Sequence, residues 1–186
     1  MGRSSLRTQR RTEIARAFAR TLAAHGAGGA TIAAVAASAG VAPGLVHHHF
    51  ESKQDLYGAL LDELLATFRR RLDAVPAGDP IDAYVTAALA LGDGSDTVTA
   101  RAWVGLFAEA LTEPTLFARM RRILDGEVAR VERRSAGALG EADCSAIVAF
   151  VLGALVFGAF APRKAAGFAA PSLRRMIGGL RRAGRP

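Results

Sequence analysis

Hydrophobic residues along this chain recur at the spacing of α-helices from near its start to near its end. Ile14, Phe18 and Leu22, for example, are four residues apart and therefore share one face of a helix. No run of the sequence keeps up the alternation of apolar and polar positions that a half-buried strand requires, and glycines and prolines separate the apolar stretches. The pattern predicts an all-α protein of about nine helices, at about 8–25, 31–39, 43–50, 52–75, 81–91, 96–111, 115–139, 141–160 and 172–182.

The second and third of these helices have the pattern of a helix-turn-helix. Thr31 can cap the first of them, because its hydroxyl accepts a free backbone N–H in the first turn. Gly40 stands where the chain must turn in a left-handed conformation. Pro43 suits the first turn of the next helix, where its missing N–H would have no partner. Two short helices joined in this way place the second one in the major groove of DNA.

The long predicted helix at 52–75 divides the chain in two. Ser52 can cap its start, and a wide apolar stripe follows it. Pro76 and Pro80 end it, and a further break is predicted at 92–95. We therefore expect a helix-turn-helix domain with a basic N-terminal arm at 1–51 and a second helical domain at 52–186, with the helix 52–75 linking the two.

The first domain resembles the DNA-binding domain of TetR-family transcriptional regulators. The resemblance covers about residues 11–61, and the family commonly has Tyr where this chain has His47, and often Ser or Thr at Ala42. It implies a regulator that binds a palindromic operator as a homodimer, with the domain at 52–186 binding an effector and forming the dimer. The matching residues are Thr31, the AxxAGV turn at Ala36 to Val41, Gly44, His49, Phe50, Ser52, Lys53, Asp55 and Leu56.

The resemblance also assigns DNA contacts by position. Pro43 and Leu45 could touch thymine methyl groups, and His48 could hydrogen-bond a base or a phosphate. Few of these side chains can make bidentate contacts with bases, so we expect part of the specificity to come from DNA shape. Base edges would be met by Pro43, Gly44, Leu45 and His48, and phosphates by Thr31, Ala42, His47 and Lys53.

Positive charge is concentrated in the same part of the chain. The protein has 24 basic and 17 acidic residues, a net charge of +7. Residues 1–50 hold about six basic residues and one acidic residue, and the rest of the chain holds about 18 and 16. Neutralising DNA phosphates requires such an excess beside the motif. A solvated basic tail is the alternative interpretation.

The segment 144–162 carries no charged residue over its whole length. That length would suit a membrane span, but the segment is rich in Ala and Gly and lies inside an otherwise soluble helical pattern. We therefore favour a buried helix at a dimer interface. In the TetR family the last two helices commonly form a four-helix bundle with those of a second subunit. The predicted interface residues are Val151, Ala154, Leu155, Gly158, Leu173, Ile177 and Leu180.

The resemblance further places an effector pocket among the helices beyond the fourth. The larger apolar side chains of that half could line it, with Arg101 and Glu109 as a polar handle, although each could equally be plain core. The segment 103–114 faintly resembles the BetI-type branch of the family. The candidate pocket residues are Trp103, Phe107, Leu111, Phe117, Met120, Leu124, Phe150 and Phe157.

Other chemistry finds little support in the sequence. The run His47-His48-His49 does not predict a metal site, because neighbouring residues on a helix point in different directions. The single cysteine, Cys144, allows no disulfide within one chain and fits a reducing cytoplasm. The sequence offers no nucleophile triad or phosphate-binding glycine loop. We expect no enzymatic activity, cofactor or metal.

Together these features predict a ligand-responsive repressor that is active as a dimer. Its two recognition helices would sit about 34–36 Å apart, to meet successive major grooves of a palindromic operator. An effector that binds more tightly to another spacing would release the DNA, and the helix 52–75 would carry the change. A DNA-binding protein with an architectural or constitutive role, and no effector, is the alternative.

Overall fold

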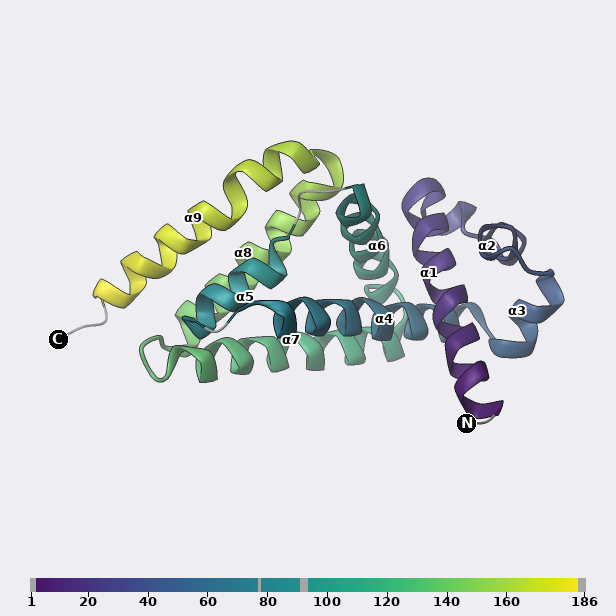
Figure 1. The fold of residues 1–186 in the computed structure, drawn as a ribbon, viewed down its shortest axis with the longest axis horizontal. Helices are drawn as coiled ribbons and strands as arrows, with labels where there is room; N and C mark the ends of the chain where they lie inside the picture. The colour runs from purple at the N-terminus through teal and green to yellow at the C-terminus, as the bar shows by residue number, and fades with distance from the viewer. Residues whose placement is uncertain (1–2, 77, 91–93, 184–186) are drawn as a thin grey trace.

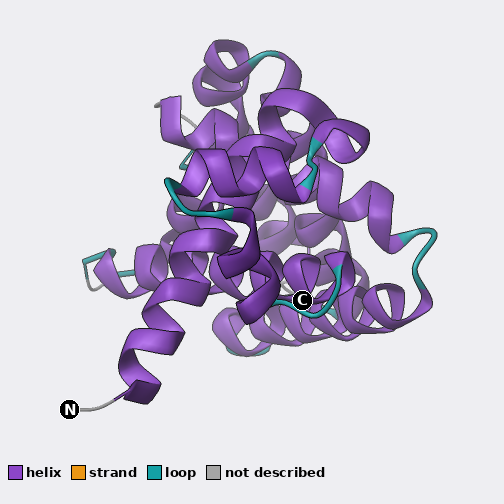
Figure 2. Cartoon of the chain, turned by 90° about the vertical axis from the view of Figure 1, so that its right-hand side faces the viewer, coloured by secondary structure: helices purple, strands orange, loops and turns teal. Residues whose placement is uncertain are grey.

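The computed structural model describes residues 3–76, 78–90 and 94–183. Over these ranges the chain forms nine α-helices and no strand, which confirms the predicted all-α class (Figures 1 and 2). The helices are α1 (Arg3–Gly29), α2 (Ile32–Ala39), α3 (Pro43–His49), α4 (Lys53–Ala74), α5 (Pro80–Ala88), α6 (Gly94–Ala110), α7 (Pro114–Ser135), α8 (Glu141–Phe160) and α9 (Pro162–Ala183).

The helix-turn-helix has the caps that its sequence predicts. The Thr31 hydroxyl accepts a hydrogen bond from the Ala34 N–H at 3.2 Å. Gly40 ends α2 in the left-handed conformation, with φ 67°, and Pro43 lies in the first turn of α3. These are local interactions within one short stretch of chain, so the motif is predictable from that stretch alone.

The nine helices pack around two apolar cores. The first core joins α1–α4 to buried residues of α6 and α7, such as Leu106 and Met120, so it includes helices from both sides of residue 51. The second core lies among α5, α7, α8 and α9 and includes Ile147 and Leu173. Figure 1 shows α4 and α7 running lengthwise through the molecule, with α1–α3 near one end of α4 and α8 and α9 near the other. Helix α4 therefore links the helix-turn-helix to the rest.

Several helix boundaries differ from the predicted ones. Helix α9 begins ten residues before the predicted position and runs through Pro171, because Ala165, Ala169 and Leu173 all face the core and hold it in place. Helix α7 ends at Ser135, since Ala136 takes a left-handed backbone with φ 51°. Helix α5 stops at Ala88. The predicted break at 92–95 falls partly outside the described ranges, which do not include residues 92 and 93.

Candidate DNA-binding surface and ligand pocket

Helix α3 presents its outer face to solvent. Its inner face is fixed, because Val46 and His49 are buried against the rest of the small domain. The predicted base-contacting positions therefore lie together on the accessible surface of one short helix. Ala42, Pro43, Gly44, His47 and His48 are exposed and Leu45 is half-buried.

A network centred on Arg11 fixes the end of α3. The Arg11 guanidinium, which comes from α1, pairs with the Asp55 carboxylate of α4 at 2.8 Å. It also donates to the His49 carbonyl and lies 4.2 Å from the ring centre of Phe50. One side chain thus joins α1, the end of α3 and the start of α4. This role was not predicted, although both Arg11 and Asp55 lie within the stretch that carries the family resemblance.

Two of the predicted phosphate contacts already have partners inside the protein. The Lys53 ammonium donates to the carbonyl of Ala27, at the end of α1, over 2.7 Å. It also lies 5.9 Å from the ring centre of Tyr57. The Thr31 hydroxyl is the cap of α2. Lys53 therefore contributes to the packing of α4 against α1 as well as standing at the edge of the predicted DNA surface.

The three successive histidines have different surroundings. His47 and His48 are exposed, while the His49 side chain is only 7 % exposed. Burial lowers the pKa of His49, and the positive charges of His48, Arg7, Arg11 and Arg10 lower it further. His49 is therefore neutral at pH 7. Within the described ranges, no three His, Cys, Asp or Glu side chains gather as a metal site requires.

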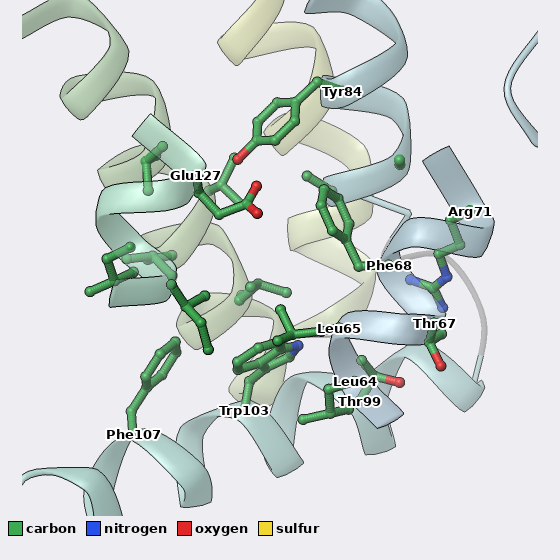
Figure 3. A pocket seen from close by; sticks show the side chains of 18 of the residues that line it. Leu64, Leu65, Thr67, Phe68, Arg71, Tyr84, Thr99, Trp103, Phe107 and Glu127 are labelled. Carbon is green, nitrogen blue, oxygen red and sulfur yellow. The ribbon is translucent and has the colours of Figure 1, made fainter. Parts of the chain in front are cut away.

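A cavity of about 90 Å³ lies between α4, α5, α6, α7 and α8 (Figure 3). Aromatic rings form much of its wall. Phe68 meets Tyr84 edge-on, with ring centres 5.8 Å apart, and Trp103 stacks on Phe107 at 5.5 Å. The polar residues of the lining are Thr67, Arg71, Tyr84, Thr99 and Glu127, and the rest are aliphatic or aromatic. A concave, mostly apolar site with a few polar groups is typical of small-molecule binding.

Four of the candidate pocket residues lie on the cavity wall, namely Trp103, Phe107, Met120 and Leu124. The other four lie outside it. Leu111 and Phe117 are 76 % and 49 % exposed, Phe157 is exposed and meets Phe168, and Phe150 packs against the second core.

The expected polar handle lies elsewhere too. Arg101 donates to the carbonyl of Ala159 at 3.2 Å, and Glu109 lies close to Tyr57, where its charge adds to burial in raising the pKa of that phenol. The sequence analysis missed Phe68, Tyr84 and Glu127 as lining residues. The wide apolar stripe of the predicted helix 52–75 was the available signal for Phe68. The sequence contains no such signal for Tyr84 and Glu127, because α4, α5 and α7 come together only in the folded chain.

Helix α8 accounts for the uncharged segment of the sequence. Among the helices that the structure describes, it is the one whose length and apolar composition could suit a membrane span. It packs against α6, α7 and α9 on one side. Its opposite side leaves an uncharged exposed surface, called here the α8 face, which consists of Ala146, Ala149, Gly153, Val156, Phe157 and Phe160.

The seven predicted dimer residues lie within the chain's own packing, and their role in a dimer stays a prediction. Val151, Ala154, Gly158, Leu173 and Ile177 are buried inside the chain's own core, because α8 and α9 pack on each other and on α5. Leu155 lines the cavity and Leu180 packs against the second core. None of these seven residues belongs to the α8 face.

The nine described helices, with α3 exposed at the end of a helix-turn-helix, define an all-α helix-turn-helix protein. A family model described as bacterial regulatory proteins, tetR family, matches residues 14–60. The chain belongs to the TetR family of regulators.

Comparison with individual proteins agrees with this assignment. The chain is 30 % identical over 131 residues to the HTH-type transcriptional regulator BetI of Burkholderia mallei, an alignment that covers 66 % of the chain and 65 % of that relative. It therefore spans just under two thirds of the length of BetI. A transcriptional regulator from Rhodococcus sp. Rha1 superposes with a TM-score of 0.82 at 25 % identity, covering 93 % of this chain and 96 % of the other. The multidrug binding protein EbrR, solved with malachite green, gives a TM-score of 0.67 at 23 % identity over 89 % and 96 %.

Proposed function

We propose that the protein is a cytoplasmic transcriptional regulator that binds a palindromic operator as a homodimer and leaves it when a small effector binds. One observation carries this proposal. Helix α4 begins beside the recognition helix, where Asp55 holds Arg11, and its later turns supply Leu64, Phe68 and Arg71 to the wall of the cavity. The same helix thus belongs to both sites. A ligand that shifts α4 also shifts the recognition helix.

The proposed DNA contacts follow from the exposed side of α3. Pro43, Gly44, Leu45 and His48 meet base edges in the major groove. Thr31, Ala42, His47 and Lys53 stand beside the phosphates, which orient the protein without reading sequence. Lys53 has three N–H donors and uses one on the Ala27 carbonyl. It can therefore hold α1 and a phosphate at the same time.

The α8 face is the proposed dimer contact. A continuous uncharged surface that includes Val156, Phe157 and Phe160 is unfavourable in water, and Phe160 is 79 % exposed. Gly153, in the middle of the face, has open space around it and would let a partner helix approach closely. Pairing of this face across a two-fold axis sets the distance between the two recognition helices.

Helix α6 provides a second connection between the cavity and the DNA-binding domain. It carries Trp103 and Phe107 on the cavity wall and packs closely on α1. A Cβ added at Gly105 would lie 2.9 Å from the Leu22 side chain, so the two helices meet at close range. An effector acts only through different affinities for the DNA-bound and DNA-free forms. Movement of α4 and α6 against α1 produces these two forms, for which the effector has different affinities.

Selection of binding sites from random duplex DNA tests the proposal. The purified protein should enrich an inverted repeat whose half-sites lie one helical turn, or a multiple of it, apart. Leu45→Ala should alter the preferred base at one position of each half-site. The matched control is Leu111→Ala, which truncates an exposed leucine outside the helix-turn-helix and should leave the preferred sequence unchanged. Binding that is sensitive to salt yet enriches no repeat would contradict the proposal and favour an architectural DNA-binding protein.

A further inference from the structure

One side chain of the cavity has unused hydrogen-bonding capacity. Glu127 of α7 lies among the lining residues, and its Oε2 atom is buried without a hydrogen-bond partner in the part of the chain that the structure describes. Its other oxygen, Oε1, accepts from the Arg130 guanidinium at 3.1 Å. Arg130 is not part of the cavity wall. The carboxylate is therefore held by Arg130 and leaves one oxygen for a ligand.

The orientation of Glu127 agrees with this role. Figure 3 shows its carboxylate pointing across the cavity toward the ring of Phe68, with Tyr84 above it. Burial, and then the negative charge of Glu127, raise the pKa of Tyr84, which confirms how close the two groups lie. A buried acceptor without a donor costs free energy, and a charged acceptor costs more than a neutral one. A ligand that donates a hydrogen bond removes that cost.

The surrounding rings favour a positively charged donor over a neutral one. Aromatic faces carry partial negative charge and attract cations, and Phe68, Tyr84, Trp103 and Phe107 supply four such rings. The Glu127 carboxylate, paired with the Arg130 guanidinium through Oε1, presents Oε2 as an acceptor toward the cavity. An anion placed beside Glu127 would be repelled, and a hydrocarbon would leave Oε2 unsatisfied.

The remaining polar residues lie away from Glu127. In Figure 3, Arg71 and Thr67 are on the opposite side of the cavity. The Arg71 guanidinium donates to the carbonyl of Ala90 at 3.4 Å, so it is engaged by the chain itself. The aliphatic and aromatic wall lies between the two ends. A ligand with one charged end and an apolar body matches this distribution.

The size of the cavity limits that body. The volume of about 90 Å³ is well above the about 10–15 Å³ that a single water molecule needs, so the cavity has room for more than water. A small organic ligand, such as one ring with a short amine chain, is the size of body that we propose for it.

We propose that the cavity binds a small aryl-alkyl ammonium cation whose N–H group bonds to Oε2 of Glu127 while its ring lies among Phe68, Trp103 and Phe107. This inference deepens the proposed function, on which it rests, by giving the chemical class of the effector.

The single tryptophan of the chain makes the test direct. Trp103 lies on the cavity wall, so its fluorescence reports binding there without any DNA. Three probes of similar size are titrated at neutral pH: 2-phenylethylammonium, propylbenzene, in which a methyl group replaces the ammonium, and 3-phenylpropionate, which is an anion. We expect the cation to bind about tenfold to a hundredfold more tightly than the hydrocarbon, as a charge-assisted hydrogen bond implies. The anion should bind more weakly than either.

A matched pair of variants locates the preference. Glu127→Gln keeps the shape of the side chain and removes its charge, and it should reduce the preference for the cation about tenfold. Glu132→Gln makes the same chemical change on the exposed side of the same helix and should leave the preference intact. The comparison of the three probes on the unmodified protein stands even if a variant folds poorly.

Three results would overturn the proposal: equal or tighter binding of propylbenzene or 3-phenylpropionate, no fluorescence response to the cation, or an unchanged preference in Glu127→Gln. Adding the cation to the protein–operator complex separates this proposal from the proposed function. If the cation binds with the expected preference but DNA affinity does not change, the cation site stands and the effector-release function fails.

Discussion

The recognition helix and the ligand cavity are built in opposite ways. Helix α3 is tied to its neighbours through buried Val46 and through the Arg11 guanidinium, which donates to the His49 carbonyl and pairs with Asp55 of α4. It has no side-chain N-cap, and Nδ1 of His49 is buried without a partner among the described residues. The cavity is hollow, and Glu127 keeps an oxygen without a partner among the described residues. A surface that reads DNA has to keep one shape, whereas a site that responds to a ligand must gain stability when that ligand arrives. The difference in packing therefore matches the difference in task.

The largest test of this contrast compares an aromatic ring of the core that supports the helix-turn-helix with one of the cavity wall. Phe18 is fully buried in the first core and meets Tyr57 edge-on at 4.9 Å. Phe18→Ala should lower the free energy of unfolding by about 3–5 kcal/mol. Phe107→Ala removes the same ring from a wall that already faces empty space, and should cost only about 1–2 kcal/mol, because fewer contacts are lost. Urea denaturation followed by circular dichroism measures both. Equal losses would show that the cavity wall is packed as tightly as the core.

The next test removes the network that holds α3. Arg11→Ala deletes the pair with Asp55 and the bond to the His49 carbonyl, both partly buried. We expect a loss of about 2 kcal/mol in unfolding free energy, since hydrogen bonds to charged groups are worth about 1.5–3 kcal/mol. Arg10→Ala, which breaks an exposed pair with Glu13 one position earlier, should stay within about 0.5 kcal/mol. If the two variants are alike, Arg11 is an ordinary surface arginine and α3 is held by its apolar side alone.

A smaller change tests the contact between the two regions. Gly105→Ala on α6 adds a methyl group 2.9 Å from Leu22 of α1. Crowding of this kind typically costs about 1–3 kcal/mol, and the better helix propensity of alanine offsets up to about 1 kcal/mol of it. We therefore expect a net loss of about 1 kcal/mol. Gly126→Ala on α7 has open space around it and should stabilise the protein by up to about 1 kcal/mol. A stabilising effect at both positions would mean that α6 and α1 separate readily.

The same contrast explains what could be predicted from the sequence. The helix-turn-helix depends on residues within one short stretch, such as Thr31, Gly40 and Pro43, so its caps and boundaries were predictable. The cavity depends on where α4, α5 and α7 meet, so Glu127 could not be distinguished from the other acidic residues of an amphipathic helix. The seven predicted interface residues on α8 and α9 stay a prediction, for a related reason. Val151 and Leu173 are apolar as an interface residue would be, but periodicity alone does not say whether such a side faces the chain's own core or a second subunit.

The smallest expected effect concerns His49, at the base of the recognition helix. Its pKa in the folded protein lies below the ordinary value of about 6.5, because burial and nearby positive charges disfavour its protonated form. When the pH falls below about 6.5, the unfolded chain therefore takes up a proton that the folded chain resists. The buried, neutral His49 therefore costs no stability above that pH, and the free energy of unfolding decreases as the pH falls below it. We therefore expect the free energy of unfolding to decrease as the pH is lowered from 7 to 5.

The measurement is the slope of unfolding free energy against pH, compared between the original chain and two variants. His49→Gln should make this slope shallower, whatever its effect on stability at pH 7, because the buried group no longer titrates. Leu111→Ala, which truncates an exposed side chain without a titratable group, should leave the slope as it is. An unchanged slope in His49→Gln would mean that water reaches the ring in solution. The base of α3 would then be looser than its buried position indicates, and the contrast with the cavity would weaken at the point where the recognition helix should be most rigid.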